Sequence, residues 1–312
     1  MKIIFMGTPE FSVPCLKMLI EEGYEIPAVI TQPDKPKGRG KKLCAPPVKE
    51  FALSCGINVY QPEKVKTKEF VGLIRSMSPD LIIVVAYGKI LSKRVLDIPR
   101  LGCINVHASL LPKYRGAAPY QWAIINGEKV TGITTMLMDE GMDTGDILLR
   151  REMNIPDDMT AGELHDKLSI MGAEILKETL KKLEMGVLTP VPQNNDEATY
   201  ASMLNKDMGN IDWTKSARDI CNLIRGTNPW PGAYTYLNGC RIRIWKAEII
   251  DNQRTGQQPG AVVDVDKCSL IVECGKGTLK VLELQMDNCR KMFTEEYLCG
   301  HKINKGDVFV KE

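Results

Sequence analysis

The clearest potential for chemistry in this chain lies in an amide, an imidazole and a carboxylate on two separate segments. Asn105 and His107 stand two residues apart near the end of an apolar run, so the alternation of a β-strand would point both side chains to one face. Asp143 lies in a loop between glycines, which let the backbone turn back toward that pair. Together the three groups suit proton-coupled attack on a carbonyl carbon.

A lone buried histidine is more often structural than catalytic. His107, however, accompanies Asn105 in the only polar interruption of a buried run, directly ahead of a loop that contains proline, arginine and glycine. Because buried polar groups are costly unless they are paired, we interpret the two residues as a catalytic pair. His165 and His301 are expected to be structural or surface residues.

Metal chemistry is disfavoured by the spacing of the possible ligands. Asp143 shares its loop with Asp139 and Asp146, which could cap the loop, but the spacing does not match a calcium-binding EF-hand. The ten cysteines are scattered and include no Cys-x-x-Cys pair, so we interpret them as reduced, mostly buried thiols rather than zinc ligands. We therefore expect no metal.

The first 150 residues predict a scaffold that could position these groups. Apolar, β-branched runs alternate there with helix-like stretches, which is typical of strands buried on both faces. The pattern predicts an α/β fold with a doubly wound, mostly parallel sheet, which would carry its active site beyond the strand ends. The expected strands are 2–7, 26–32, 81–88, 103–107 and 132–138, and the expected helices are 12–22, 46–55, 67–78 and 119–126.

A long amphipathic helix is predicted for residues 161–185. Apolar side chains recur there at spacings of three and four, Thr160 and Glu163 form a capping box, and Gly186 is placed to end the helix. We expect this helix to complete a catalytic domain that spans residues 1–188.

A smaller β-rich domain is predicted to follow. Residues 189–197 have the proline and polar content of a linker, which we expect to span 189–207, and a short helix is expected at 214–225. Asn238-Gly239 then lies between two short strands and is the strongest short-range signal for a hairpin turn. We expect residues 208–312 to form a β-barrel or a partly open sheet.

Composition argues against a membrane-spanning or exported chain. The longest apolar run, Leu81 to Tyr87, is far shorter than the ~20 residues that span a bilayer. The N-terminus opens directly into Lys-Ile-Ile-Phe-Met-Gly, without a signal or transit segment. We therefore expect a cytoplasmic protein without a membrane partner.

The densest basic run, residues 33–42, carries five cations and one carboxylate. Its prolines and glycines are expected to keep it out of any helix or strand. Such a run is usually a solvated loop, but beside an active-site edge it would suit a phosphate backbone, because Lys and Arg contacts release counterions. The residues predicted to contact nucleic acid are Lys35, Lys37, Arg39, Lys41 and Lys42.

These motifs resemble the methionyl-tRNA formyltransferase family over essentially the whole chain. The Asn-x-His…Ser-Leu-Leu-Pro and Asp-x-Gly-x-Asp-x-Gly elements are shared by a wider group that uses 10-formyltetrahydrofolate, whereas the basic loop and the C-terminal domain point to the tRNA-directed branch. The segments that carry the resemblance are Phe-Met-Gly-Thr-Pro-Glu-Phe (5–11), Gln-Pro-Asp-Lys-Pro-Lys-Gly-Arg-Gly-Lys-Lys (32–42), Asn-Val-His-Ala-Ser-Leu-Leu-Pro-Lys-Tyr-Arg-Gly (105–116), Met-Asp-Glu-Gly-Met-Asp-Thr-Gly-Asp (138–146) and Asn-Pro-Trp-Pro-Gly-Ala (228–233).

The resemblance implies a Rossmann-like catalytic domain and an OB-like barrel that helps to hold tRNA. It implies that 10-formyltetrahydrofolate is the formyl-donor co-substrate and that methionyl-initiator tRNA is the acceptor, with no obligate protein partner and a monomeric chain. It makes Asn105, His107 and Asp143 the catalytic trio, and Arg39 the most specific tRNA contact. The residues implied to line the folate site are Ser109, Leu110, Leu111 and Pro112, with Tyr87 and Leu91 bordering the pterin.

Three other functions compete with this interpretation. Folate-linked formyl transfer or hydrolysis on a small molecule would ignore tRNA, and a non-catalytic RNA-binding protein would leave the Asn105, His107 and Asp143 pattern unexplained. A nicotinamide-dependent oxidoreductase comes last, because Gly7-Thr8-Pro9 after the first strand lacks the Gly-x-Gly-x-x-Gly fingerprint.

Overall fold

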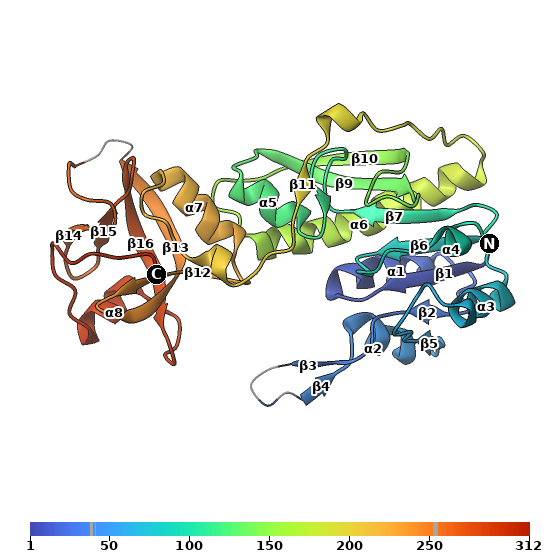
Figure 1. Cartoon of the computed structure of the whole chain (residues 1–312), viewed down its shortest axis with the longest axis horizontal. Coiled ribbons are helices and arrows are strands. Elements are labelled where there is room, and N and C mark those ends of the chain that lie inside the picture. Colours follow the sequence, from blue (N-terminus) through green and yellow to red (C-terminus); the bar gives the residue numbers. More distant parts are fainter. Residues whose placement is uncertain (38–39, 41, 252–254) are drawn as a thin grey trace. The chain divides into compact units, whose positions relative to one another are not determined.

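Apolar runs that are buried along their whole length form the centre of a sheet in the computed structural model (Figure 1). β1 (Ile3–Gly7), β6 (Leu81–Val85) and β7 (Cys103–His107) lie side by side and run parallel. Continuous burial of this kind is expected where helices cover both faces of a parallel sheet. All three strands fall within runs from which strands were predicted.

The whole sheet has seven strands in the order β10-β9-β7-β6-β1-β2-β5. The strands from β5 to β7 are parallel, β9 is antiparallel to β7, and β10 pairs with β9. The chain passes from β1 outward to β2 and β5 and returns to β6 on the other side of β1, so the predicted doubly wound, mostly parallel sheet is confirmed. The outer strands are β2 (Val29–Ile30), β5 (Val59–Tyr60), β9 (Val130–Leu137) and β10 (Ile147–Asn154).

Helices connect the parallel strands, and a long helix follows β10. The capping box predicted for that long helix, α6, is present, because Glu163 Oε2 accepts from the Thr160 backbone N–H and the Thr160 hydroxyl accepts from Glu163 N–H. A hydrogen bond of 2.8 Å between the Thr179 and Thr135 hydroxyls fixes α6 to β9. The helices are α1 (Val13–Glu21), α2 (Pro47–Ser54), α3 (Lys68–Met77), α4 (Lys93–Leu96) and α6 (Ala161–Glu184).

The basic run does not follow its prediction. β3 (Lys35–Lys37) and β4 (Lys42–Cys44) form an antiparallel hairpin, so the expectation that the run stays out of any strand is wrong. Pro36, which lies opposite Leu43, is tolerated because proline can occupy an edge strand whose N–H side faces solvent. Arg39 and Lys41 lie outside the described residues.

The chain divides into two compact units. Residues 191–201, which we expected in a linker, belong to the first unit, where Val191 pairs with Ile147, and β11 (Tyr200–Ala201) pairs with β8 (Arg115–Gly116). The structure describes residues 1–37, 40, 42–251 and 255–312. The first unit comprises residues 1–119, 130–153 and 165–202, and the second comprises 120–129, 154–164 and 203–312.

The second unit contains the predicted β-rich domain, together with residues 120–129 and 154–164. Its main sheet has the order β12-β13-β16-β15-β14, and the C-terminal segment bridges both edges, because Val310 pairs with Tyr236 of β12 and Val308 pairs with Ala261 next to β14. This closure is barrel-like. Asn238 and Gly239 form the predicted turn, both with positive φ. The elements are α5 (Pro119–Ile125), α7 (Ala217–Gly226), β12 (Ala233–Leu237), β13 (Cys240–Asp251), β14 (Val262–Val265), β15 (Leu270–Glu273), β16 (Thr278–Met286), β17 (Met292–Phe293) and α8 (Thr294–Gly300).

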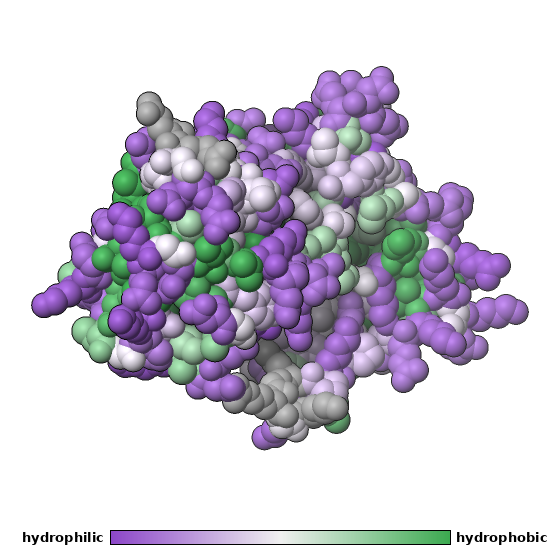
Figure 2. Space-filling model, turned by 60° about the vertical axis from the view of Figure 1, so that its left-hand side comes forward, coloured by the Kyte–Doolittle hydropathy of each residue, from purple (hydrophilic) through white to green (hydrophobic). Residues whose placement is uncertain are grey.

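The surface of the structure and its cysteines can be compared with what the sequence predicted for them. Among the described residues, no helix is both long and apolar enough to cross a membrane. The face drawn in Figure 2 is mainly hydrophilic, with smaller hydrophobic patches. The cysteines are all free, but the expectation that most are buried is wrong, since only Cys15, Cys103 and Cys274 are buried.

Helix α3 offers a test of local stability. The Thr67 hydroxyl caps it by accepting from Phe70 N–H, so Thr67→Ala should lower the free energy of unfolding by about 1 kcal/mol. Urea unfolding followed by circular dichroism measures this. Ser76→Ala in the same helix removes an exposed hydroxyl that bonds to the Leu73 carbonyl and should change stability by less than about 0.5 kcal/mol. Equal losses would contradict the cap.

Candidate active site

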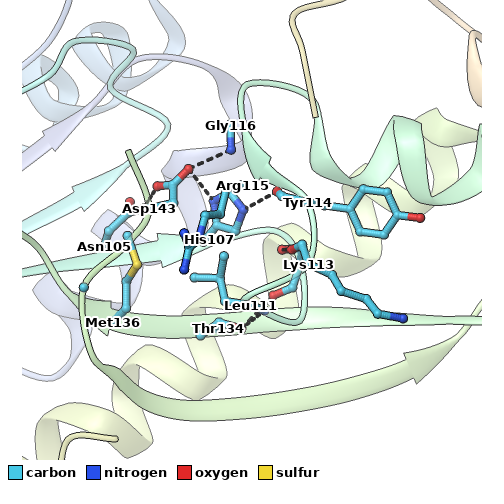
Figure 3. A network of polar contacts seen from close by, with 12 residues as sticks. Asn105, His107, Leu111, Lys113, Tyr114, Arg115, Gly116, Thr134, Met136 and Asp143 are labelled. Atoms are coloured by element: carbon cyan, nitrogen blue, oxygen red, sulfur yellow. Dashed lines mark hydrogen bonds and ion pairs between the residues drawn. The ribbon is translucent and has the colours of Figure 1, made fainter. Parts of the chain in front are cut away.

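The last residues of β7 place an amide and an imidazole on one face of the sheet. Asn105 and His107 lie opposite Met136 and Thr134 of antiparallel β9. Their side chains are 9% and 6% exposed, so each keeps only a narrow access to solvent. Figure 3 shows both of them directed toward Asp143, as their alternation along the strand predicted.

Asp143 joins this pair from the loop between β9 and β10. Its Oδ1 accepts from Asn105 Nδ2 at 3.3 Å, and its Oδ2 accepts from the Gly116 backbone N–H at 2.8 Å. Oδ2 also lies 3.6 Å from His107 Nδ1. The structure therefore brings the three predicted residues together, whereas their catalytic roles stay predictions.

The surroundings of His107 determine how its ring carries protons. Nε2 lies 2.9 Å from the Tyr114 carbonyl oxygen, which can only accept, so Nε2 carries a hydrogen. Nδ1 faces the Asp143 carboxylate. Each ring nitrogen therefore has an oxygen acceptor nearby, at 2.9 Å from Nε2 and at 3.6 Å from Nδ1.

Close packing shapes the loop that carries Asp143. Asp139 Oδ1 accepts from Gly141 N–H and from the Thr144 hydroxyl, so Asp139 caps the loop, as one interpretation of the sequence held. A Cβ at Gly145 would collide with the Leu137 carbonyl oxygen, which means that the loop folds back against the end of β9. In the part of the chain that is described, no group of three or more His, Cys, Asp or Glu could hold a metal ion.

The residues implied to line a folate site fall into two groups. Ser109 and Leu111 are fully buried in the loop after β7, where Thr134 of β9 holds the loop through the Ser109 carbonyl and Leu111 N–H. Pro112 is buried and Leu110 is half-buried.

Tyr87 and Leu91 belong to the apolar cluster beside β6 and are 1% and 2% exposed. Burial raises the pKa of Tyr87 to about 12. Among the described residues, its hydroxyl has no hydrogen-bond partner. The contact of both groups with a ligand stays a prediction.

The basic hairpin of β3 and β4 is anchored at its base. Lys49 donates to both oxygens of Asp34 and to Gln61 Oε1, and Gln61 Nε2 donates to Asp34. The hydrogen bonds from Lys49 and Gln61 hold the pKa of the Asp34 carboxyl below its usual value. Lys35 and Lys42 are exposed, and Lys35 Nζ bonds to Gln32 Oε1 at 2.8 Å.

Sequence reasoning missed three partners of the trio. Gly116 N–H and the Tyr114 carbonyl act through the backbone, so no side-chain pattern marks them. Gln193 reaches the Asp143 loop from beyond α6. Its place in a polar, proline-containing stretch indicated only a linker.

Two family descriptions match this chain, one for each of its two main parts. Residues 1–180 match the family described as "Formyl transferase", and residues 203–302 match "Formyl transferase, C-terminal domain". The methionyl-tRNA formyltransferase of Acetivibrio thermocellus is 60% identical over 308 residues, which are 99% of each chain. The enzyme of the same name from Ruminiclostridium cellulolyticum is 58% identical over 312 residues, which are 100% of each.

Solved structures share the fold at much lower identity. The N-formyltransferase from Helicobacter canadensis, in complex with folinic acid and dTDP-3-aminofucose, is 19% identical, with a TM-score of 0.67. The match covers 94% of this chain and 100% of that one. At this identity the likeness establishes the fold alone.

The close approach at Gly145 generates a prediction for formyl transfer, the activity named for these relatives. Gly145→Ala should displace the loop that carries Asp143 and lower kcat by about 100-fold, since a shift of about 1 Å at an active site has that effect. Gly72→Ala in α3, where a Cβ would meet no atom of the described residues within 4 Å, should leave kcat unchanged. Equal kcat values in the two variants would contradict this geometry.

Proposed function

This chain belongs to the formyl transferase family, and we propose that it transfers the formyl group of 10-formyltetrahydrofolate to the free α-amino group of methionyl-initiator tRNA. Formyl transfer to methionyl-tRNA is the activity named for relatives that are 58% and 60% identical over nearly the whole chain, and it is the activity of this enzyme. The product of the proposed reaction is N-formylmethionyl-tRNA, for translation initiation.

The convergence of Asn105, His107 and Asp143 on one face of β7 carries the proposal. An amide donor, an imidazole held by the Tyr114 carbonyl, and a carboxylate lie within hydrogen-bond or ion-pair reach of one another. Groups of this kind stabilise the charges of an acyl-transfer transition state.

A folate-type donor is supported by the family and by the folinic acid bound to the Helicobacter canadensis N-formyltransferase. The Tyr87 hydroxyl, which has no hydrogen-bond partner among the described residues, supports such a ligand. A buried polar group without a partner costs about 1–3 kcal/mol, and a polar heterocycle would supply the missing hydrogen bond. When bound, the donor supplies the formyl carbon. Tyr87, Leu91 and residues 109–112 are the proposed lining.

In the proposed mechanism, the α-amine attacks the formyl carbon directly and gives a tetrahedral intermediate with an oxyanion. Asn105 Nδ2 has two hydrogens, and only one is needed for its bond to Asp143. The other donates to the oxyanion. His107 supplies a second donor from Nδ1, because its Nε2 hydrogen is used by the Tyr114 carbonyl and Asp143 Oδ2, 3.6 Å from Nδ1, lies beyond hydrogen-bond distance.

Proton transfer completes the reaction. A free peptide α-amine has a pKa of about 8, and an esterified amino acid lies lower, so enough neutral amine exists near pH 7. Asp143 balances the charge of His107 and helps to move the amine's proton to the departing folate nitrogen. Stabilisation of the oxyanion is therefore the main contribution of the trio.

Replacement of Asn105 tests this assignment. Asn105→Ala should lower kcat by about 10²–10³, the usual effect of losing one oxyanion donor, and leave the Kd for methionyl-tRNA nearly unchanged. Steady-state kinetics and a filter-binding assay measure the two quantities. The exposed Asn58→Ala should alter neither. Weakened binding with a normal kcat would make Asn105 structural.

For the acceptor, we propose that the basic run, residues 33–42, contacts the acceptor arm of the initiator tRNA through Lys35, Lys37, Arg39, Lys41 and Lys42. The exposed positions of Lys35 and Lys42 support this. Further proposals are a monomer without an obligate protein partner and a cytoplasmic location, where initiator tRNA is charged and used.

Arg39→Ala tests the proposed contact between the basic run and tRNA. It should weaken tRNA binding and reduce the slope of log K against log salt by about 1, as expected for one lost phosphate contact. Arg75→Ala, in the last turn of α3, is the charge-matched control and should keep the slope. An unchanged slope for Arg39→Ala would remove Arg39 from the interface.

The choice of acceptor distinguishes the proposal from its competitors. Radiolabelled 10-formyltetrahydrofolate is offered together with initiator methionyl-tRNA, elongator methionyl-tRNA, glycinamide ribonucleotide and water. Label on the initiator ester alone is expected. Label on the small molecule, or released as formate, would keep the trio and reject the tRNA acceptor.

A further inference from the structure

The loop that carries Asp143 holds a conformation that needs outside support. Asp143 has a φ of 57°, in the left-handed region that residues other than glycine rarely adopt. Such a conformation is energetically unfavourable and persists only where the surrounding structure imposes it. Because the same backbone turn aims the carboxylate at Asn105 and Gly116, whatever holds the turn also aims the carboxylate.

Gln193 supplies contacts that can hold this turn. Its Nε2 donates to the Asp143 carbonyl at 2.9 Å and to the Gly145 carbonyl at 2.7 Å. The two hydrogens of the amide therefore form hydrogen bonds with the carbonyls on either side of Thr144. Gln193 approaches from the segment after α6, which is 50 residues beyond Asp143 in the sequence.

Arg115 determines which end of the Gln193 amide faces the loop. Its Nε and Nη2 donate to Gln193 Oε1 at 3.1 Å and 2.8 Å, and Nη2 also donates to Asn195 Oδ1 at 2.8 Å. A guanidinium can only donate, so Oε1 must face Arg115 and Nε2 must face the carbonyls. Arg115 is 2% exposed, which makes this orientation independent of solvent.

We propose that Gln193 is a positioning residue for Asp143, oriented by the buried Arg115. Arg115 and its neighbour Gly116 then act on the same loop in two ways. Gly116 N–H binds the Asp143 side chain directly, and Arg115 holds the Asp143 backbone through Gln193. The inference rests on the proposed catalytic role of Asp143.

Gln193→Glu separates the two ends of the amide. A carboxylate still accepts from Arg115, so that contact survives, but it presents an oxygen to two carbonyl oxygens and cannot hold the loop. We expect kcat for formyl transfer to fall about 10- to 100-fold, as for a misplaced catalytic group, with KM for methionyl-tRNA and the Tm unchanged. Asn194→Asp makes the same charge change one residue away, on an exposed side chain that bonds within its own turn, and should keep full activity.

A double-mutant cycle with Asp143→Asn tests whether Gln193 acts through Asp143. If it does, Gln193→Glu should cost less than about 3-fold further in the Asp143→Asn background, because contacting residues that share one role are not additive. A full, multiplicative loss in that background would overturn the inference, and so would a normal kcat in Gln193→Glu alone. A normal kcat in Asp143→Asn would overturn the proposed mechanism as well, so the two failures are distinguishable.

Discussion

The hydrogen bonds of one carboxylate join parts of the chain that the sheet alone does not bring together. Asp143 is only partly accessible, with 16% of its side chain exposed, and a carboxylate in such a place must be well hydrogen bonded. Its oxygens find their partners on β7 and at Gly116, so the strand, the loop after it and the loop after β9 are held in one arrangement. The rest of the site depends on that arrangement, because the Tyr114 carbonyl that orients His107 belongs to the same loop as Gly116.

The direction of β9 explains why the loop must fold back. β9 runs antiparallel to β7 and ends with Leu137 opposite Ile104, near the start of β7 rather than its end. The loop that follows β9 therefore begins near the end of β7 that is opposite to His107. It has to run back along β7 to bring Asp143 to that residue. Glycine at position 145 permits this return, since no side chain fits against the Leu137 carbonyl oxygen there. If β9 ran parallel to β7, both strands would end at the same edge of the sheet, and the loops after them would begin there together.

Patterns of local origin were predictable from the sequence, and contacts between distant backbone groups were not. The capping box before α6 and the Asn238-Gly239 turn depend on neighbouring residues, and the alternation of apolar runs with helix-like stretches indicated the doubly wound sheet; all three were predicted. The position of Asn105 and His107 on one face of β7 followed from the alternation of side chains along a strand. The hairpin of the basic run was missed because cross-strand pairing outweighed the local preferences of proline and glycine. Gln193 was missed because its partners are the side chain of Arg115, 78 residues away, and two carbonyls that carry no side-chain signal.

Electrostatics limits how the proposed trio can work. A carboxylate close to a developing oxyanion raises the energy of that oxyanion, because like charges repel strongly where water is scarce. Asp143 would therefore oppose the reaction if it acted beside a neutral imidazole. The proposed mechanism therefore needs a positive charge on His107 in the transition state to balance Asp143, while Asn105 and the Nδ1 hydrogen, which lies beyond hydrogen-bond distance of Asp143 Oδ2 at 3.6 Å, donate to the oxyanion. The Tyr114 contact is thus as important as the carboxylate, since it commits the Nε2 hydrogen and leaves Nδ1 as the nitrogen that donates to the oxyanion.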